Sequence, residues 1–300
     1  MIKIPNCENF VKIEPINKGW VVDNEKKFYI ETNDGQRLLL RITDASEYEN
    51  IKTKFEMLEL LAGLNISMSR PINFGFCDDI RVYQLLTWVD GEDIESTLPV
   101  MPTSEQYDWG LKAGKILRDI HSVPSPKDTC SWDVHFNNML QGELESYCSK
   151  TESHSEHGEI IIAYLKENND VLGMRPQTFI HGDYNPGNLI MMSSGELGVI
   201  DFSSGYGDPF WDIFKVSWRP HLFPHFYSGQ IYGYFNCEPA LDFWKVYSYY
   251  FAFGALIALQ APYWVGFNNL EEGKGVARNI LTWSRSFKNL IPSWYLGNNK

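Results

Sequence analysis

The chain has 300 residues, which exceeds a typical single domain, so we expect two subdomains around one cleft. Hydrophobic residues make up 44% of it and aromatic residues 15%, a composition that supports a sizeable core and argues against a disordered chain. The formal net charge of −12 argues against a nucleic-acid partner, because neutralising phosphates requires clustered lysine and arginine, whereas an acidic surface suits a cationic small molecule.

The cysteines and the apolar segments indicate where the chain resides. The five cysteines are odd in number, scattered and without a CxxC pair, which indicates a reducing compartment and no structural zinc. The start of the chain, MIKIPNCENF, lacks the apolar segment of a secretion signal. The most apolar run, about residues 249–259, is too short to span a bilayer and predicts a buried helix. We therefore expect a cytoplasmic protein with no membrane partner.

The first part of the chain predicts a small antiparallel sheet and one helix. Residues 10–42 have the pattern of a three-stranded meander, in which Asn33-Asp34-Gly35 is the tight turn before the last strand. A helix is predicted over residues 44–64, where apolar residues recur at helical spacing. Arg70-Pro71 then opens a pair of strands. The five predicted strands are 10–16, 27–32, 37–42, 72–76 and 81–87.

The remainder of the chain has mainly helical patterns. We predict helices at 104–120, 132–147, 158–172, from 209, at 240–262 and at 273–290. The polar stretch of residues 150–157 is interpreted as an exposed loop rather than as a metal site formed by Glu152, His154, Glu156 and His157. His121, at the end of the first of these helices, is interpreted as structural.

Residues 178–208 contain the most informative pattern in the chain. Three short apolar runs alternate with polar turns, Asp183 and Asn188 lie five residues apart in the first turn, and Asp201 ends the last run thirteen residues later. A carboxylate, an amide and a second carboxylate in this order suit a magnesium-bound nucleotide, because one can orient a hydroxyl while two hold the metal. A surface hairpin with ordinary turn residues would account for the glycines and proline but not for Asp201.

The pattern H-G-D-x-x-x-x-N, followed by I-D-F, resembles the phosphotransfer core of the aminoglycoside phosphotransferase and choline kinase family, which is distantly related to the protein kinases. The resemblance is specific over residues 179–212 and extends over roughly 10–290. It implies an α+β, protein-kinase-like two-lobed fold, with an N-lobe of residues 1–89 on a small antiparallel sheet and a larger, mostly helical C-lobe of residues 90–300. The matching residues are His181, Gly182, Asp183, Pro186, Gly187, Asn188, Asp201 and Phe202.

This resemblance implies a role for each residue of the pattern. Asp183 would be the catalytic residue, and Asn188 and Asp201 would hold Mg²⁺. His181 would brace the loop rather than act as a base. Asp208 is explained better as the cap of the helix that begins at Pro209 than as a third metal ligand. The pattern departs from the family at Tyr184-Asn185, where relatives often have Leu-His, and at Ser203, where protein kinases have Gly.

The resemblance also implies how the nucleotide is bound. Arg41 stands where the family commonly has the lysine that pairs with the α- and β-phosphates, although it could also be an exposed charge at a strand end. Glu56, fifteen residues later, would pair with Arg41, with Glu49 as the second choice. Residues 17–24 would cover the nucleotide, although their single glycine leaves an ordinary hairpin loop equally open.

Trp88 and Val89 match the hinge whose backbone contacts the nucleobase in this family, although Trp88 could also be a core residue. The C-terminal helices would form the acceptor pocket. There, tryptophans together with acidic residues could bind an amine, or the tryptophans could simply fill a core. These residues are Trp218, Trp244, Trp264, Trp283 and Trp294 with Glu238, Asp242, Glu271 and Glu272.

The implied reaction is transfer of the γ-phosphoryl group of ATP or GTP to a hydroxyl of a small, amine-bearing molecule. An aminoglycoside-type antibiotic is the first expectation, which would make the protein a resistance enzyme. Choline, ethanolamine, an amino sugar and a macrolide remain open as acceptors. The other reading is a non-catalytic, nucleotide-binding pseudokinase, against which the intact Asp183, Asn188 and Asp201 argue.

Overall fold

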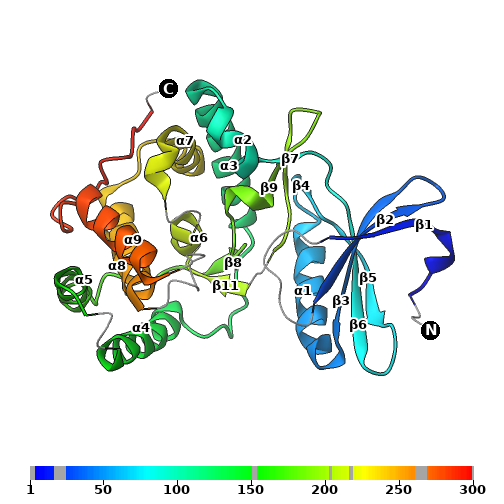
Figure 1. Cartoon of the computed structure of the whole chain (residues 1–300), viewed down its shortest axis with the longest axis horizontal. Coiled ribbons are helices and arrows are strands. Elements are labelled where there is room, and N and C mark those ends of the chain that lie inside the picture. The colour runs from blue at the N-terminus through cyan, green and yellow to red at the C-terminus, as the bar shows by residue number, and fades with distance from the viewer. Residues whose placement is uncertain are drawn as a thin grey trace. The chain divides into compact units, whose positions relative to one another are not determined.

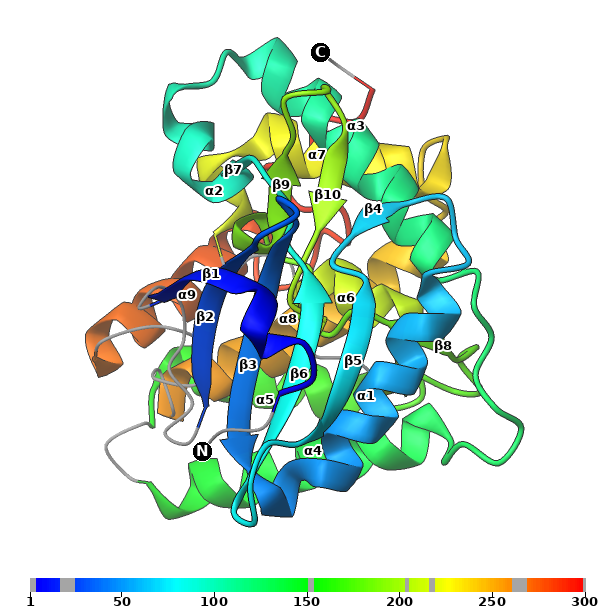
Figure 2. The ribbon, with the colours of Figure 1, turned by 90° about the vertical axis from the view of Figure 1, so that its right-hand side faces the viewer.

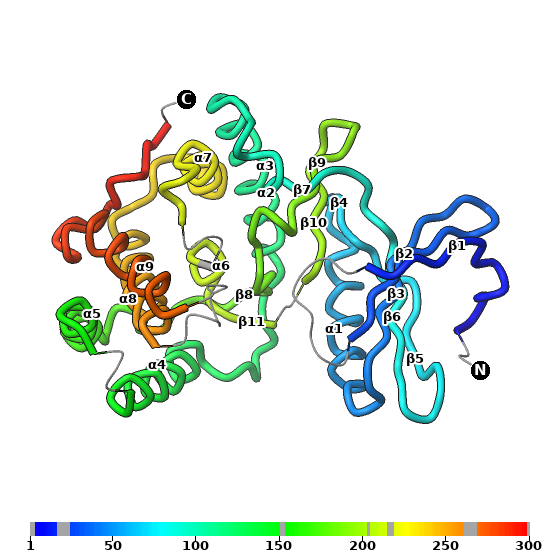
Figure 3. Tube along the Cα trace, viewed as in Figure 1, coloured from blue at the N-terminus to red at the C-terminus, as the bar shows by residue number. Residues whose placement is uncertain are grey.

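The computed structural model describes residues 4–16, 25–150, 154–202, 205–215, 219–260 and 269–298. The chain divides into two units, the first made of Met1–Ile94 with Gly187–Ser203 and the second of Glu95–Pro186 with Ser204–Lys300 (Figures 1 and 3). In the described ranges, no helix combines the length and the apolar character needed to cross a membrane.

The first unit is built on a five-stranded antiparallel sheet in the order β1-β2-β3-β6-β5 (Figure 2). All five strands were predicted from the sequence. The turn at Asn33-Asp34-Gly35 joins β2 to β3, and Gly35 has a φ of 83°, a conformation that favours glycine. The strands are β1 (Phe10–Pro15), β2 (Lys26–Thr32), β3 (Arg37–Asp44), β5 (Pro71–Phe76) and β6 (Arg81–Thr87), and a short helix, η1 (Cys7–Asn9), precedes them.

The two faces of this sheet differ in chemistry. One face has an apolar core that includes Ile30, Leu40 and Leu85. The other face is packed by α1 (Tyr48–Leu61), which follows η2 (Ala45–Glu47) and contacts the sheet through Phe55, whose ring centre lies 4.8 Å from that of Phe74. Because side chains alternate between the faces of a strand, a residue's position in β2, β3 or β6 decides whether it joins the core or faces α1.

A second, four-stranded sheet explains why a hairpin from late in the chain belongs to the first unit. Its order is β4-β10-β9-β7, with β10 parallel to β4 and antiparallel to β9. The strands have two or three residues each, too few to produce an alternating pattern that would identify β4 and β7 in the sequence. They are β4 (Ser67–Met68), β7 (Glu92–Asp93), β9 (Leu189–Met191) and β10 (Leu197–Val199), and η5 (Pro186–Asn188) precedes β9.

The second unit is mainly helical, with one short antiparallel pair of strands, β8 (Thr178–Ile180) and β11 (Gly205–Gly207). The predicted helices are present, although α5 and α9 end several residues earlier than expected. The helices are α2 (Ile94–Thr97), η3 (Leu98–Val100), α3 (Thr103–Ile120), α4 (Trp132–Ser149), α5 (Glu156–Glu167), α6 (Pro209–Lys215), η6 (Pro220–Leu222), α7 (Pro224–Phe235), α8 (Leu241–Gln260) and α9 (Leu270–Trp283).

The helix α7 was not predicted from the sequence, although it packs closely along α3. Glycines permit this approach: a Cβ atom on Gly114 of α3 would lie 2.0 Å from the carbonyl oxygen of Gln230, and one on Gly233 of α7 would lie 2.3 Å from that of Leu111. The segment carries two glycines and is buried around most of its circumference. It therefore lacks both the helix propensity and the one-sided apolar pattern by which helices are recognised.

Tryptophans of the C-terminal part fill the core of the second unit. Trp244, Trp283 and Trp294 are buried, which favours the core interpretation for these three residues. Trp218 and Trp264 lie outside the described residues.

Candidate active site

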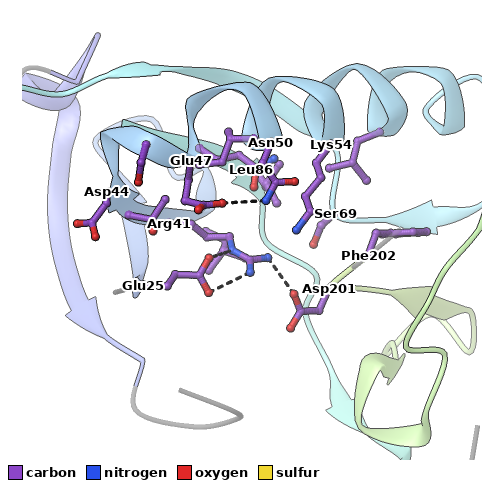
Figure 4. A pocket seen from close by; sticks show the side chains of 16 residues that line it. Glu25, Arg41, Asp44, Glu47, Asn50, Lys54, Ser69, Leu86, Asp201 and Phe202 are labelled. Carbon is purple, nitrogen blue, oxygen red and sulfur yellow. Dashed lines mark hydrogen bonds and ion pairs between the residues drawn. The ribbon is translucent and has the colours of Figure 1, made fainter. Parts of the chain in front are cut away.

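Arg41 lies in a cluster of charged side chains on the face of the sheet that α1 covers (Figure 4). Its Nη1 donates to Oδ1 of Asp201 at 2.8 Å, while Nε and Nη2 donate to the two carboxylate oxygens of Glu25 at 2.6 and 3.0 Å. Burial alone would lower the pKa of Arg41, but the hydrogen bonds and charges of Glu25 and Asp201 outweigh burial and raise it. The guanidinium is therefore a permanent charge in a fixed orientation.

Asp201 lies two residues after β10 and has a φ of 58°, which is uncommon for a residue other than glycine. Its Oδ2 lies 3.2 Å from Nζ of Lys27, so the carboxylate contacts two cations. Burial would raise the pKa of Asp201, but the charges of Arg41 and Lys27 hold it below its ordinary value. The charges of Arg41 and Lys27 therefore keep this carboxylate ionised.

The hairpin of β9 and β10 brings the backbone of Asn188 close to the segment that leads into Asp201. The register pairs Leu189 with Val199, and the carbonyl of Asn188 accepts a hydrogen bond from the N–H of Ile200 at 3.0 Å. Asn188 and Asp201 therefore lie at the same end of the hairpin.

A carboxylate and an amide oxygen are hard oxygen ligands of the kind that Mg²⁺ prefers. The described residues contain no group of three or more His, Cys, Asp or Glu side chains arranged to hold a metal. The amide of Asn188 and the carboxylate of Asp201 fit Mg²⁺ in a nucleotide site. In such sites one or two protein ligands are usual, and phosphate oxygens and water complete the coordination.

A cavity of about 270 Å³ adjoins the cluster, and all of its lining residues belong to the first unit. Its walls come from β3, β6 and α1, with Arg41 and Asp201 on one side (Figure 4). On α1 the residues that face the cavity follow helical spacing and include Asn50, Lys54 and Leu58. The cavity therefore lies beside the charged cluster, between the sheet and the helix.

The predicted pairing of Arg41 with Glu56 is not formed. Lys54 lines the cavity, and Glu56 follows it by two residues. At 3.6 residues per turn the two side chains differ by about 200° around the helix axis, so Glu56 points away from the cavity. Glu56 is exposed and makes no ion pair within the described ranges, and Glu49 is exposed as well. Glu25 holds Arg41 instead, from the residue before β2, and nothing in the sequence motif identified it.

The hinge residues lie after β6. Trp88 packs edge-on against Tyr29, with ring centres 5.0 Å apart, and its N–H donates to the carbonyl of Arg37 at 2.9 Å. Among the residues that the structure describes, none bonds to the backbone of Val89. Trp88 is thus engaged in the fold.

The predicted catalytic residue, Asp183, lies in the second unit, because the chain passes from one unit to the other after Pro186. Its N–H donates to Nδ1 of His181 at 3.1 Å, and the side-chain amide of Asn185 donates to its Oδ1 at 2.9 Å. His181 is fully buried, so it braces the loop as the sequence predicted. Asn185, where relatives often have histidine, orients the carboxylate of Asp183.

A buried carboxylate on α6 holds the same loop. Asp212 accepts hydrogen bonds from the N–H groups of His181 and Gly182 and lies 3.1 Å from Nε2 of His121. His121 is buried and also bonded to Tyr234, in agreement with its interpretation as structural.

Asp208 is also accounted for by the fold. It accepts from the N–H of Phe210 at 3.0 Å, which confirms it as a cap of α6, and it pairs with Arg175 and Tyr250. Several other sequence predictions lie outside the described residues, namely the loop of residues 17–24, Glu152, Trp218, Ser203 and Trp264.

The model of the phosphotransferase enzyme family (APH) matches residues 12–247, more than half of the chain. The chain belongs to this family. Membership confirms the resemblance inferred from the motif around Asp183 and establishes the protein as a phosphotransferase.

Named relatives of this phosphotransferase differ in the acceptors that their names give. A protein of Synechocystis sp. (strain PCC 6803), named as a probable ketoamine kinase, is 24% identical over 241 residues, which covers 75% of this chain and 74% of the relative. Among solved structures is a thermostable variant of the aminoglycoside phosphotransferase APH(4)-Ia in complex with AMP-PNP and hygromycin B. Its TM-score is 0.68 at 13% sequence identity, and the match covers 94% of this chain and 96% of the APH(4)-Ia chain. The GDP complex of aminoglycoside 2'-phosphotransferase-IIIa has a TM-score of 0.63 at 15% sequence identity. The match covers 91% of this chain and 93% of that protein's chain.

These structural similarities confirm the predicted fold class. The phosphotransferase has a protein-kinase-like fold, with an antiparallel sheet in its N-terminal region and helices in its C-terminal region, as in the solved structures. The complexes with AMP-PNP and GDP support a nucleotide as the phosphoryl donor of this family.

Proposed function

We propose that this protein transfers the γ-phosphoryl group of ATP or GTP to a hydroxyl of a small, amine-bearing molecule, with an aminoglycoside as the first candidate. The proposal rests on the observation that Arg41 and Lys27 both form ion pairs with the carboxylate of Asp201. Phosphoryl transfer requires positive charge and a metal-binding carboxylate at one place, because catalysis depends on positioning and on offsetting phosphate charge.

The nucleotide would be held mainly by the first unit. Arg41 would pair with the non-transferred phosphates, a role that a guanidinium can fill with two parallel hydrogen bonds. Glu25, rather than Glu56, would keep Arg41 in place. Val89 would offer its backbone to the nucleobase, while Trp88 would support the hinge from the side of the sheet.

Asn188 and Asp201 would hold Mg²⁺, which when bound offsets the charge on the phosphate oxygens. Asp183 would orient the acceptor hydroxyl and accept its proton late in the transfer, when the bond to the leaving group is largely broken. Asn185 would keep the carboxylate of Asp183 turned to that hydroxyl. His181 has no part in the proton transfer in this proposal, because it is buried within the loop.

The choice of an aminoglycoside rests on the solved complex with hygromycin B and on the net charge of −12, which favours a cationic acceptor. A ketoamine is the second candidate, favoured by the 24% identity to the Synechocystis protein. A nucleotide-dependent reaction and five unpaired cysteines fit the reducing cytoplasm. An antibiotic acceptor would make the protein a resistance enzyme.

The test is a nucleotide-consumption assay with Mg-ATP and Mg-GTP against aminoglycosides, ketoamines, choline, amino sugars and macrolides, with the product identified by mass spectrometry. We expect acceptor-dependent turnover, and we expect Asp183→Asn to reduce it by about a hundredfold or more while nucleotide binding persists. Magnesium-dependent nucleotide binding without turnover on any acceptor would favour the pseudokinase instead. Near-normal turnover by Asp183→Asn would refute the role of Asp183.

A further inference from the structure

A row of polar side chains crosses the sheet of the first unit on the face that α1 covers. Lys27 of β2 is paired in register with Arg41 of β3, which is paired in turn with Gln84 of β6. Residues paired across neighbouring strands share a face, so Lys27 and Arg41 stand side by side. Lys27 lies outside the sequence motifs and has no part in the function proposed above beyond its contact with Asp201.

The two cations converge on one carboxylate. Arg41 contacts Oδ1 of Asp201 at 2.8 Å and Lys27 contacts Oδ2 at 3.2 Å, so each oxygen has its own cation. Lys27 also lies 3.7 Å from Glu25, and only 20% of its side chain is exposed. The adjacent Lys26 is exposed, as expected for the opposite side of a strand.

We propose that Lys27 is a second phosphate-binding cation of the active site, which contacts Asp201 in competition with the metal ion and pairs with the phosphates of the nucleotide. This inference rests on the proposed function. A metal held by Asp201 would bind a carboxylate whose two oxygens each contact a cation here, and two cations at one carboxylate repel each other. A triphosphate carries enough negative charge to attract the same ammonium group.

This arrangement predicts two effects of opposite sign when the charge of Lys27 is removed. The metal alone should bind more tightly, because its competitor at Asp201 is gone. The nucleotide should bind more weakly, because one of its cations is gone. A lysine that only stabilised the sheet would not produce this combination, since a damaged fold weakens both kinds of binding.

The experiment compares Lys27→Gln with Lys26→Gln, which removes the same charge from the neighbouring residue on the opposite face, and with Lys27→Arg, which keeps the charge. Mn²⁺ binding without nucleotide is measured by electron paramagnetic resonance, and binding of a non-hydrolysable ATP or GTP analogue is measured by calorimetry. Thermal unfolding of each variant checks that it is folded.

We expect Lys27→Gln to bind Mn²⁺ about threefold to fivefold more tightly and the analogue about fivefold more weakly, which corresponds to the loss of one partly exposed ion pair in each case. Lys26→Gln and Lys27→Arg should stay near the wild type in both. If Lys27→Gln matches Lys26→Gln while the wild type binds nucleotide and transfers phosphate, the inference is wrong and the proposed function stands. A wild type that binds neither Mn²⁺ nor nucleotide would refute both.

Discussion

The N–H of His181 donates to Oδ2 of Asp212 at 2.5 Å, and the same carboxylate accepts from Gly182 at 2.8 Å. These two residues directly precede Asp183. Asp212 is fully buried and also contacts His121. A charged group without solvent must be satisfied by the protein, so the loop that carries Asp183 and the helix α6 hold each other in place.

Replacing Asp212 by asparagine should therefore destabilise the protein in a pH-dependent way. Burial raises the pKa of Asp212, but His121, His181 and the N–H groups of the loop outweigh burial and hold it below the ordinary value. A depressed pKa contributes stability that is present above the unfolded value of about 3.9 and is lost as the pH falls through the folded pKa. We expect Asp212→Asn to cost about 1–3 kcal/mol at pH 7 and less below pH 4.

Urea unfolding of the wild type and of Asp212→Asn at a series of pH values measures this difference. A gap in unfolding free energy that stays constant from neutral pH into the acid range would contradict the argument. A gap that closes in acid would show that the ionised carboxylate, rather than its shape, supports the loop.

The close contact of α3 and α7 gives a second prediction, in which two glycine substitutions have opposite effects. A Cβ on Gly114 would lie 2.0 Å from the carbonyl oxygen of Gln230, which belongs to the backbone and cannot move aside without shifting the helix. Gly114→Ala should lower the free energy of unfolding by about 1–3 kcal/mol or more. Gly142 lies exposed within α4 with open space around it, so Gly142→Ala should raise it by about 0.5–1 kcal/mol. Thermal unfolding of both variants decides the point, and equal effects would disprove it.

The sequence predicted the elements that have a one-sided or alternating pattern. The five strands of the first sheet and most helices belong to this group, because each has one face in a core. The helix α7 was missed because its contact with α3 depends on glycines, and β4 and β7 were missed because two residues carry no pattern. These elements are specified by their tertiary contacts rather than by their local sequence.

The residues of the candidate site likewise fall into those that the sequence motif indicates and those that only the tertiary structure reveals. Asp183, Asn188 and Asp201 could be proposed from the sequence because their chemistry and spacing form one motif within a short stretch of the chain. Glu25 and Lys27 were not, because they reach Arg41 and Asp201 only through the pairing of β2 with β3 and through ion pairs that span up to 174 residues of sequence. The resemblance therefore pointed to Glu56, whereas the residues of α1 that line the cavity include Asn50 and Lys54 but not Glu56.

Asn185 provides a third prediction, on the orientation of Asp183. Its side-chain amide donates to Oδ1 of Asp183 at 2.9 Å. Losing a hydrogen bond to a charged group costs about 1.5–3 kcal/mol, so Asn185→Ala should lower kcat by about tenfold to a hundredfold. The KM for the nucleotide should change little, because this side chain contacts Asp183 rather than the phosphate cluster. Asn185→His introduces the residue that relatives often have and should retain more activity than the alanine variant. Equal losses in both would argue that the hydrogen bond is unimportant.

The last prediction distinguishes Glu25, which contacts Arg41 in the structure, from Glu56, which the resemblance suggested. Glu25 accepts two hydrogen bonds from Arg41, and both side chains are largely buried. Glu25→Gln removes the charge and one of the two acceptor oxygens, so the guanidinium loses its fixed orientation, and the Kd for the nucleotide should rise by about threefold to tenfold. Glu56→Gln makes the same chemical change on the exposed side of α1 and should leave the Kd unchanged. Calorimetric titration of both variants with a nucleotide analogue compares them directly. If Glu56→Gln weakens nucleotide binding and Glu25→Gln does not, Arg41 is held by the helix when the nucleotide binds and the assignment of Glu25 is wrong.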